Sequence, residues 1–124
     1  MNPVSTPTSS YQPGIHCIVD IYSTSHYLTK SLVLKELWDK LIEELELQKV
    51  GEVYHQFENG GFTAVVCLTE SHLSIHTWPE YGYATFDIFL SNYQQVNDKK
   101  GDLIVQRTTE HLEAFKVNLQ KLRR

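Results

Sequence analysis

The segment Glu70–Tyr83 concentrates side chains that can do chemistry. Its 14 residues hold two histidines, two serines, two carboxylates and three aromatic rings. The segment directly follows an apolar run, residues 62–69, that is typical of a buried strand. Titratable and nucleophilic groups gathered at the end of a strand indicate a functional site more than a scaffold.

Two familiar chemistries fit this segment poorly. His55, His72 and His76 could be imagined as zinc ligands, but no Cys-x-x-Cys or helical His-x-x-x-His accompanies them. The sequence therefore predicts no metal site. A Ser71–His76–Glu80 triad lacks the Gly-x-Ser-x-Gly elbow, and residues this close on one strand do not easily converge. The pattern alone leaves an unassigned enzyme site or an aromatic interface.

The elements that must position these residues follow from apolar spacing. Period-two alternation and apolar runs predict strands, which we place at 15–22, 52–57, 62–69, 72–77 and 83–90. A turn, Glu58–Gly61, joins the second and third of them. In the strand 72–77, Leu73 and Ile75 should lie on one face. His72, Ser74 and His76 should lie on the other.

Two further stretches have helical spacing. Residues 34–45 repeat apolar side chains at i, i+3, i+4 and i+7, which predicts an amphipathic helix. After a polar loop over 91–101, the same spacing runs from Ile104 to Leu122 and predicts a final helix. A strand and a helix, followed by four strands and a final helix, predict an α+β two-layer sandwich, an antiparallel sheet covered by helices on one face.

The other face of such a sheet would need a partner. Two helices cannot bury all the aromatic residues present, which include Phe57, Phe62, Trp78, Tyr81, Tyr83, Phe86 and Phe89. A dimer is therefore expected on packing grounds. We expect a single domain over 14–124 and a disordered tail over 1–13, which is rich in proline, serine and threonine.

Composition limits the partners and the compartment. The 124-residue chain has a formal net charge of −4, which argues against nucleic acid, and it has no apolar run of membrane-spanning length. The N-terminus lacks the pattern of a secretory signal. Cys17 and Cys67 lie in apolar runs, so we expect reduced core cysteines in a cytoplasmic protein.

The stretch Glu70–Ala84 resembles the signature of bacterial and archaeal S-adenosylmethionine decarboxylases. The likeness extends back through Gly61–Ala64, Gly51–Phe57 and Gly14–Cys17, and forward to Asp87–Phe89. This resemblance implies a dimer in which the sheets of two protomers pack face to face, as four layers in the order αββα. It also implies a proenzyme that cleaves itself.

The implied chemistry centres on the bond between Glu70 and Ser71. The Ser71 hydroxyl would attack the Glu70 carbonyl, and cleavage would yield fragments 1–70 and 71–124, with a covalent pyruvoyl cofactor formed from Ser71. The pyruvoyl ketone would condense with the amine of S-adenosylmethionine and accept electrons as CO₂ leaves. The product would supply aminopropyl groups for spermidine synthesis.

The resemblance also assigns the remaining site residues. His76 matches a histidine that assists processing, and Thr63 occupies the place of a serine that helps in the same step. Phe57 matches an aromatic suited to stacking on adenine. Glu80 matches a carboxylate that could accept hydrogen bonds from the ribose hydroxyls.

One position departs from the family. Ser91, in the context Phe89-Leu90-Ser91-Asn92, stands where the relatives have a cysteine that is the proposed proton donor. An alcohol is a far weaker acid than a thiol. Three readings follow: Ser91 relays a proton from His76 or water and the activity is retained, the substrate is ornithine or arginine, or the chain is a non-catalytic partner subunit. We favour the first, because Ser71, His76, Phe57 and Glu80 are all present.

Overall fold

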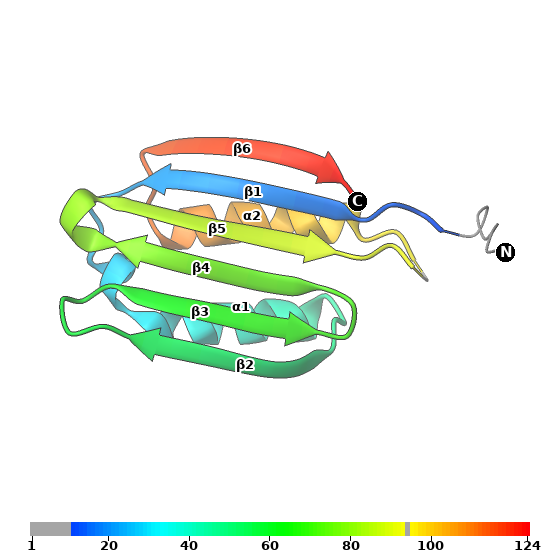
Figure 1. Cartoon of the computed structure of the whole chain (residues 1–124), viewed down its shortest axis with the longest axis horizontal. Coiled ribbons are helices and arrows are strands. Elements are labelled where there is room, and N and C mark those ends of the chain that lie inside the picture. Colours follow the sequence, from blue (N-terminus) through cyan, green and yellow to red (C-terminus); the bar gives the residue numbers. More distant parts are fainter. Residues whose placement is uncertain (1–10, 94) are drawn as a thin grey trace, which may run out of the picture.

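The chain forms one six-stranded antiparallel sheet, with the strand order β2-β3-β4-β5-β1-β6 (Figure 1). The computed structural model describes residues 11–93 and 95–124. Most of the tail predicted over 1–13 lies outside the described residues. The strands are β1 (Ile15–Tyr22), β2 (Lys49–Gln56), β3 (Phe62–Leu68), β4 (His72–Trp78), β5 (Tyr83–Leu90) and β6 (Lys116–Arg123).

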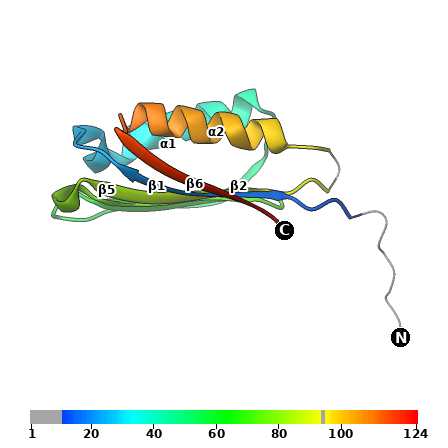
Figure 2. The ribbon, with the colours of Figure 1, turned by 90° about the horizontal axis from the view of Figure 1, so that it is seen from above.

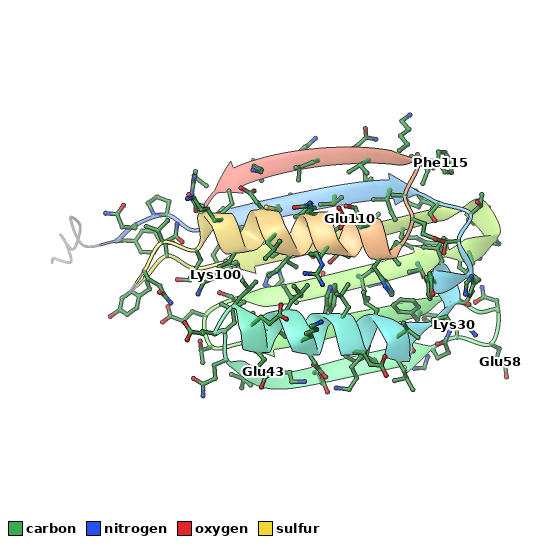
Figure 3. The ribbon with its side chains drawn as sticks, turned by 180° about the vertical axis from the view of Figure 1, so that it is seen from behind. Lys30, Glu43, Glu58, Lys100, Glu110 and Phe115 are labelled. Atoms are coloured by element: carbon green, nitrogen blue, oxygen red, sulfur yellow. The ribbon has the colours of Figure 1, made fainter. Side chains whose placement is uncertain are left out.

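Both α-helices lie on the same face of the sheet, as the edge-on view in Figure 2 shows. These are α1 (Ser31–Glu44) and α2 (Asp98–His111), and Figure 3 views the molecule from their side. Two short 3-10 helices, η2 (His26–Thr29) and η3 (Pro79–Tyr81), lie at one end of the sheet. The predicted α+β two-layer sandwich is confirmed.

The core fills the space between the sheet and the two helices. Alternate residues of β1 face it, and Cys17, Val19 and Ile21 are fully buried. The indole of Trp38 in α1 donates a hydrogen bond of 3.0 Å to the Thr108 hydroxyl in α2, so a buried polar pair joins the helices. In β4, Leu73 and Ile75 are fully buried and His72, Ser74 and His76 are not, as the alternation predicts.

Within the described residues, no element covers the second face of the sheet. Val53 in β2 and Val65 in β3 are 66% and 43% exposed there, and Trp78 at the end of β4 is 37% exposed. The aromatic residues divide between the faces: Phe62 and Phe86 are buried under the helices, while Phe57 and Tyr81 are exposed. We call the uncovered surface the open face.

The prediction of a final helix reaching Leu122 is wrong. The helix α2 ends at His111, and Glu113 adopts a positive φ of 54° that ends the helical path. The Phe115 amide then donates to the Tyr22 carbonyl, and β6 pairs with the whole of β1. Lys121 and Arg123 of β6 form ion pairs with α2, at Asp102 and Asp98. These contacts join parts of the chain far apart in sequence, which helical spacing does not reveal.

Cys67 also departs from its predicted core position. Cys17 is buried as predicted, but Cys67 is exposed on β3 beside the open face. The reason is the period of the strand: Phe62, Ala64, Val66 and Leu68 point to the helices, so the odd-numbered residues point away.

No helix among the described residues is both long and apolar enough to cross a membrane.

Candidate active site

The Glu70–Ser71 bond lies in the turn between β3 and β4, which the chain exposes at one end of the sheet. The Leu68 amide donates to the Ser71 carbonyl at 2.9 Å and closes this turn. Glu70 is exposed and Ser71 is half-buried. The Ser91 amide, at the end of β5, donates to the Ser71 hydroxyl oxygen at 2.9 Å. The structure thus brings together Ser71 and Ser91, which the sequence separates by 20 residues.

A cavity of about 180 Å³ opens around these two serines. The end of β3, the end of β5, the segment after α1 and the loop before α2 all contribute to it. Its lining includes Glu46, Glu70, Tyr93 and Asn97 beside the two serines. Its walls are more polar than apolar, as suits a site that handles charged groups. We call this the serine end of the sheet.

The other predicted residues meet at the opposite end of the sheet. Phe57, Thr63, His76 and Glu80 line a second cavity of about 380 Å³, together with Asn59, Thr77 and Trp78. The turn after β2 supplies Phe57, β3 supplies Thr63, and β4 and η3 supply His76 and Glu80. We call this the histidine end.

Two side-chain contacts organise the histidine end. The Thr63 hydroxyl lies 2.9 Å from His76 Nδ1, because the two residues are cross-strand partners in β3 and β4. The Asn59 amide donates to a Glu80 carboxylate oxygen at 3.2 Å. The sequence predicts for Asn59 only a place in the turn Glu58–Gly61. Asn59 lies beside Glu80 because β3 pairs with β4, and composition does not reveal that pairing.

One protomer does not bring the two ends together. Ser71 and His76 are five steps apart along an extended strand, a separation of about 16 Å at the usual rise per residue. Figure 1 shows the β3–β4 turn and the β2–β3 turn at opposite ends of the sheet. A Ser71–His76–Glu80 triad therefore does not form within the chain, in agreement with the sequence argument against it.

A histidine cluster lies on the open face toward the serine end, where His16 and His72 both pair with Phe89. His16 Nε2 and His72 Nε2 lie 2.7 and 2.9 Å from the same oxygen of Asp87, and the Ser74 hydroxyl donates to the other oxygen. Arg124 lies 3.2 Å from His16 Nδ1. Sequence reasoning missed this cluster, since β1, β4 and β5 must become neighbours before it exists.

Hydrogen bonding accounts for this cluster better than a metal does. Among the described residues, His16, His72 and Asp87 form the group whose spacing would suit an ion, whereas the trio His55, His72 and His76 forms no such group. A guanidinium only donates, so His16 Nδ1 must accept from Arg124 and the ring hydrogen sits on Nε2, toward Asp87. A metal would need that Nε2 lone pair.

The contribution of the Asp87 carboxylate to the free energy of unfolding can be tested. Burial opposes its ionisation, but hydrogen bonds from Ser74, His16 and His72 outweigh burial and lower its pKa. We expect Asp87→Asn to reduce the free energy of unfolding by about 2 kcal/mol in urea titrations at pH 7. Asp102→Asn, at an exposed ion pair, should cost less than about 1 kcal/mol.

The pH dependence of the Asp87 contribution has a defined sign. Because the folded-state pKa is depressed, the stabilisation is complete above the unfolded-state value of about 3.9. It is lost as the pH falls through the folded-state pKa. The difference between wild type and Asp87→Asn should therefore shrink below about pH 4. A difference that stays constant down to pH 2 would contradict this assignment.

Comparisons with known proteins identify the family of this chain. Residues 15–124 match the family model for S-adenosylmethionine decarboxylase. The S-adenosylmethionine decarboxylase proenzyme of Archaeoglobus fulgidus is 44% identical over 61% of this chain and 69% of its own length. That of Picrophilus torridus is 35% identical over 75% of this chain and 72% of its own.

A solved structure agrees with the fold. The crystal structure of the adenosylmethionine decarboxylase from Aquifex aeolicus superposes with a TM-score of 0.77 at 28% sequence identity, and the match covers 92% of each chain. The family model spans nearly all of the described sheet and both helices. The chain therefore belongs to the S-adenosylmethionine decarboxylase family.

Proposed function

We propose that this chain is a self-processing S-adenosylmethionine decarboxylase whose pyruvoyl cofactor forms from Ser71. The observation that carries the proposal is the Ser71 hydroxyl, fixed by the Ser91 amide at an exposed Glu70–Ser71 bond. Family membership supports the substrate. The two free cysteines are in keeping with the cytoplasmic setting expected from the sequence.

The turn offers what self-cleavage requires. Ser71 Oγ bonds to the Glu70 carbonyl carbon while the bond from that carbon to the Ser71 nitrogen breaks, and the hydroxyl proton passes to the nitrogen. Loss of the Ser71 Cα proton together with the Cβ–Oγ bond then forms a Cα=Cβ double bond and releases Glu70 as a carboxyl terminus. The enamine takes up a proton at Cβ and becomes an imine, and water replaces the nitrogen, which leaves as ammonia. The exposed Glu70 can depart without disturbing the core. When formed, the pyruvoyl group supplies a carbonyl that accepts electrons during decarboxylation.

A second copy of the chain completes the site in this proposal. The open face exposes apolar side chains such as Val53 and Val65 that a partner sheet would bury. A twofold axis running across the strands would set the serine end of one protomer against the histidine end of its partner. Each homodimer would then contain two complete sites, which fits the four-layer arrangement expected from the resemblance.

The histidine end supplies processing and substrate contacts. His76 moves protons during cleavage, and its hydrogen bond to Thr63 holds the ring in place, as a hydroxyl at this position should. Phe57, 46% exposed in the isolated protomer, is free to stack on adenine. Glu80, held by Asn59, accepts from the ribose hydroxyls.

We expect Glu80→Gln to weaken substrate binding more than it weakens chemistry. Replacing a carboxylate acceptor with a neutral amide should raise KM for S-adenosylmethionine about tenfold while kcat changes little, because the ribose is remote from the reacting carbon. Glu58→Gln, exposed in the turn between β2 and β3 at the same end of the sheet, is the matched control and should leave both constants unchanged. Equal loss of kcat in Glu80→Gln would contradict a ribose contact.

Mass spectrometry and substrate comparison test the proposal as a whole. The purified protein should consist of fragments 1–70 and 71–124, with the second blocked by a carbonyl that reacts with hydrazines. It should release CO₂ from S-adenosylmethionine and not from ornithine or arginine. An intact chain under denaturing conditions would favour a non-catalytic partner subunit. Turnover of ornithine or arginine alone would reassign the substrate.

A further inference from the structure

The proposed reaction leaves one proton without a donor. After CO₂ leaves, the substrate carbon must take up a proton, and at position 91 this chain has an alcohol. The Ser91 hydroxyl oxygen already accepts a hydrogen bond of 3.1 Å from the Tyr93 amide. Thiols titrate near pH 8.5 and phenols near pH 10, whereas alcohols do not titrate in water at accessible pH. A stronger acid than serine is therefore needed nearby.

The cavity at the serine end contains one side chain of the required kind. Its titratable lining residues are Glu46, Glu70 and Tyr93. A carboxylate only accepts hydrogen bonds, whereas a phenol carries an O–H that it can donate. Glu70, moreover, becomes a chain terminus once the bond to Ser71 is cut. Within one protomer, Tyr93 is then the remaining acid that lines the cavity of Ser71.

The segment that follows β5 fixes Tyr93 beside this site. The side-chain amide of Asn97 donates to the Ser91 carbonyl at 2.7 Å. The backbone N–H of Asn97 donates to Asn92 Oδ1, also at 2.7 Å. The Asn92 side chain in turn donates to the Pro13 carbonyl. The Tyr93 amide is bonded to Ser91, so the two residues stay together. Tyr93 is 58% exposed, which gives its phenol access to solvent protons.

We propose that the Tyr93 phenol donates the proton that replaces CO₂ on the substrate carbon. This inference rests on the proposed function. The O–H bond of Tyr93 breaks, and the electron pair left by the departing carboxylate forms the new C–H bond. The phenolate then regains a proton from water, so Tyr93 is unchanged after each turnover. Ser91 contributes its backbone N–H to the Ser71 hydroxyl in the uncleaved chain, and its own hydroxyl anchors Tyr93.

Tyr93→Phe tests this role in the full-length, processed enzyme. We expect the cleaved fragments to form normally and kcat to fall about 100-fold, because a positioned general acid contributes at least that factor. A second readout is the mass of fragment 71–124 after turnover. Without the phenol, the proton should add to the pyruvoyl carbon instead of the substrate carbon, which leaves alanine in place of the pyruvoyl group. The mass of the fragment should then change as activity decays.

Three further variants make the outcome decisive. Tyr11→Phe, equally exposed at 54% but outside the cavity, should behave as wild type. Adding Ser91→Cys to Tyr93→Phe should restore kcat at least tenfold, because a thiol then stands at the position the relatives use. Full activity and an unchanged fragment mass in Tyr93→Phe would overturn the inference. So would loss of activity in Ser91→Ala with Tyr93→Phe unaffected. Failure of the wild-type chain to cleave would instead reject the proposed function.

Discussion

Ser71→Ala is expected to remain a single uncleaved chain with no detectable decarboxylase activity. Alanine has no oxygen on Cβ, so it can neither attack the Glu70 carbonyl nor be eliminated to form the pyruvoyl group. The Ser91 amide loses its acceptor, but it is half-buried beside the cavity at the serine end, where water can replace the hydroxyl. The fold should persist, and denaturing mass spectrometry should find one mass in place of two.

The control for Ser71→Ala removes a hydroxyl elsewhere. Thr109→Ala deletes a hydroxyl on α2 that donates to the Gln106 carbonyl, and it should cleave and turn over as wild type. Urea unfolding of Ser71→Ala should give a midpoint close to that of an uncleaved wild-type chain. Cleavage of Ser71→Ala at the same bond would show that a different residue forms the cofactor, and the assignment of Ser71 would fail.

Mixing two inactive variants is expected to restore activity. Ser71→Ala damages only the serine end, and His76→Ala damages only the histidine end, which lie about 16 Å apart in one protomer. If each site combines one end from each protomer, a heterodimer of the two variants contains one intact site and one doubly damaged site. Co-expression in equal amounts should therefore give about one quarter of the wild-type activity.

The same experiment contains its own control. His76→Ala co-expressed with Thr63→Ala damages the histidine end in both chains, so no combination yields a site with both side chains intact. That pair should show no gain over the average of its homodimers. If the Ser71→Ala and His76→Ala pair also shows no gain, the two ends do not cooperate across a dimer. The site would then need a rearrangement within one chain.

Most of the fold could be predicted from local patterns, and the failures are long-range. The strand over 83–90 and the alternation of β1 follow from period two, and α1 from its apolar spacing. The strand β6 was hidden because Leu119 and Leu122 continue a helical spacing from α2. The backbone leaves the helical path at Glu113, which has a positive φ. The following residues then pair with β1, about a hundred residues earlier in the chain, and this pairing overrides the helical spacing.

The candidate site shows the same limit. The sequence names Ser71 and His76, yet their nearness along the chain suggests a shared pocket that an extended strand prevents. Conversely, Ser91 is distant in sequence and hydrogen-bonded to Ser71 in space. Asp87 and its two histidines are invisible until three strands are side by side. Types of residue were predictable, but neighbours across strands were not.

The strand order determines how the two fragments of the proposed cleavage would be held together. Fragment 1–70 contains β1, β2 and β3, and fragment 71–124 contains β4, β5 and β6. In the sheet, β1 from the first fragment is threaded between β5 and β6 of the second, and β3 is bonded to β4. Three of the five strand junctions thus join different polypeptides. If the chain cleaves itself as proposed, the two products stay interlaced and cannot separate without opening the sheet.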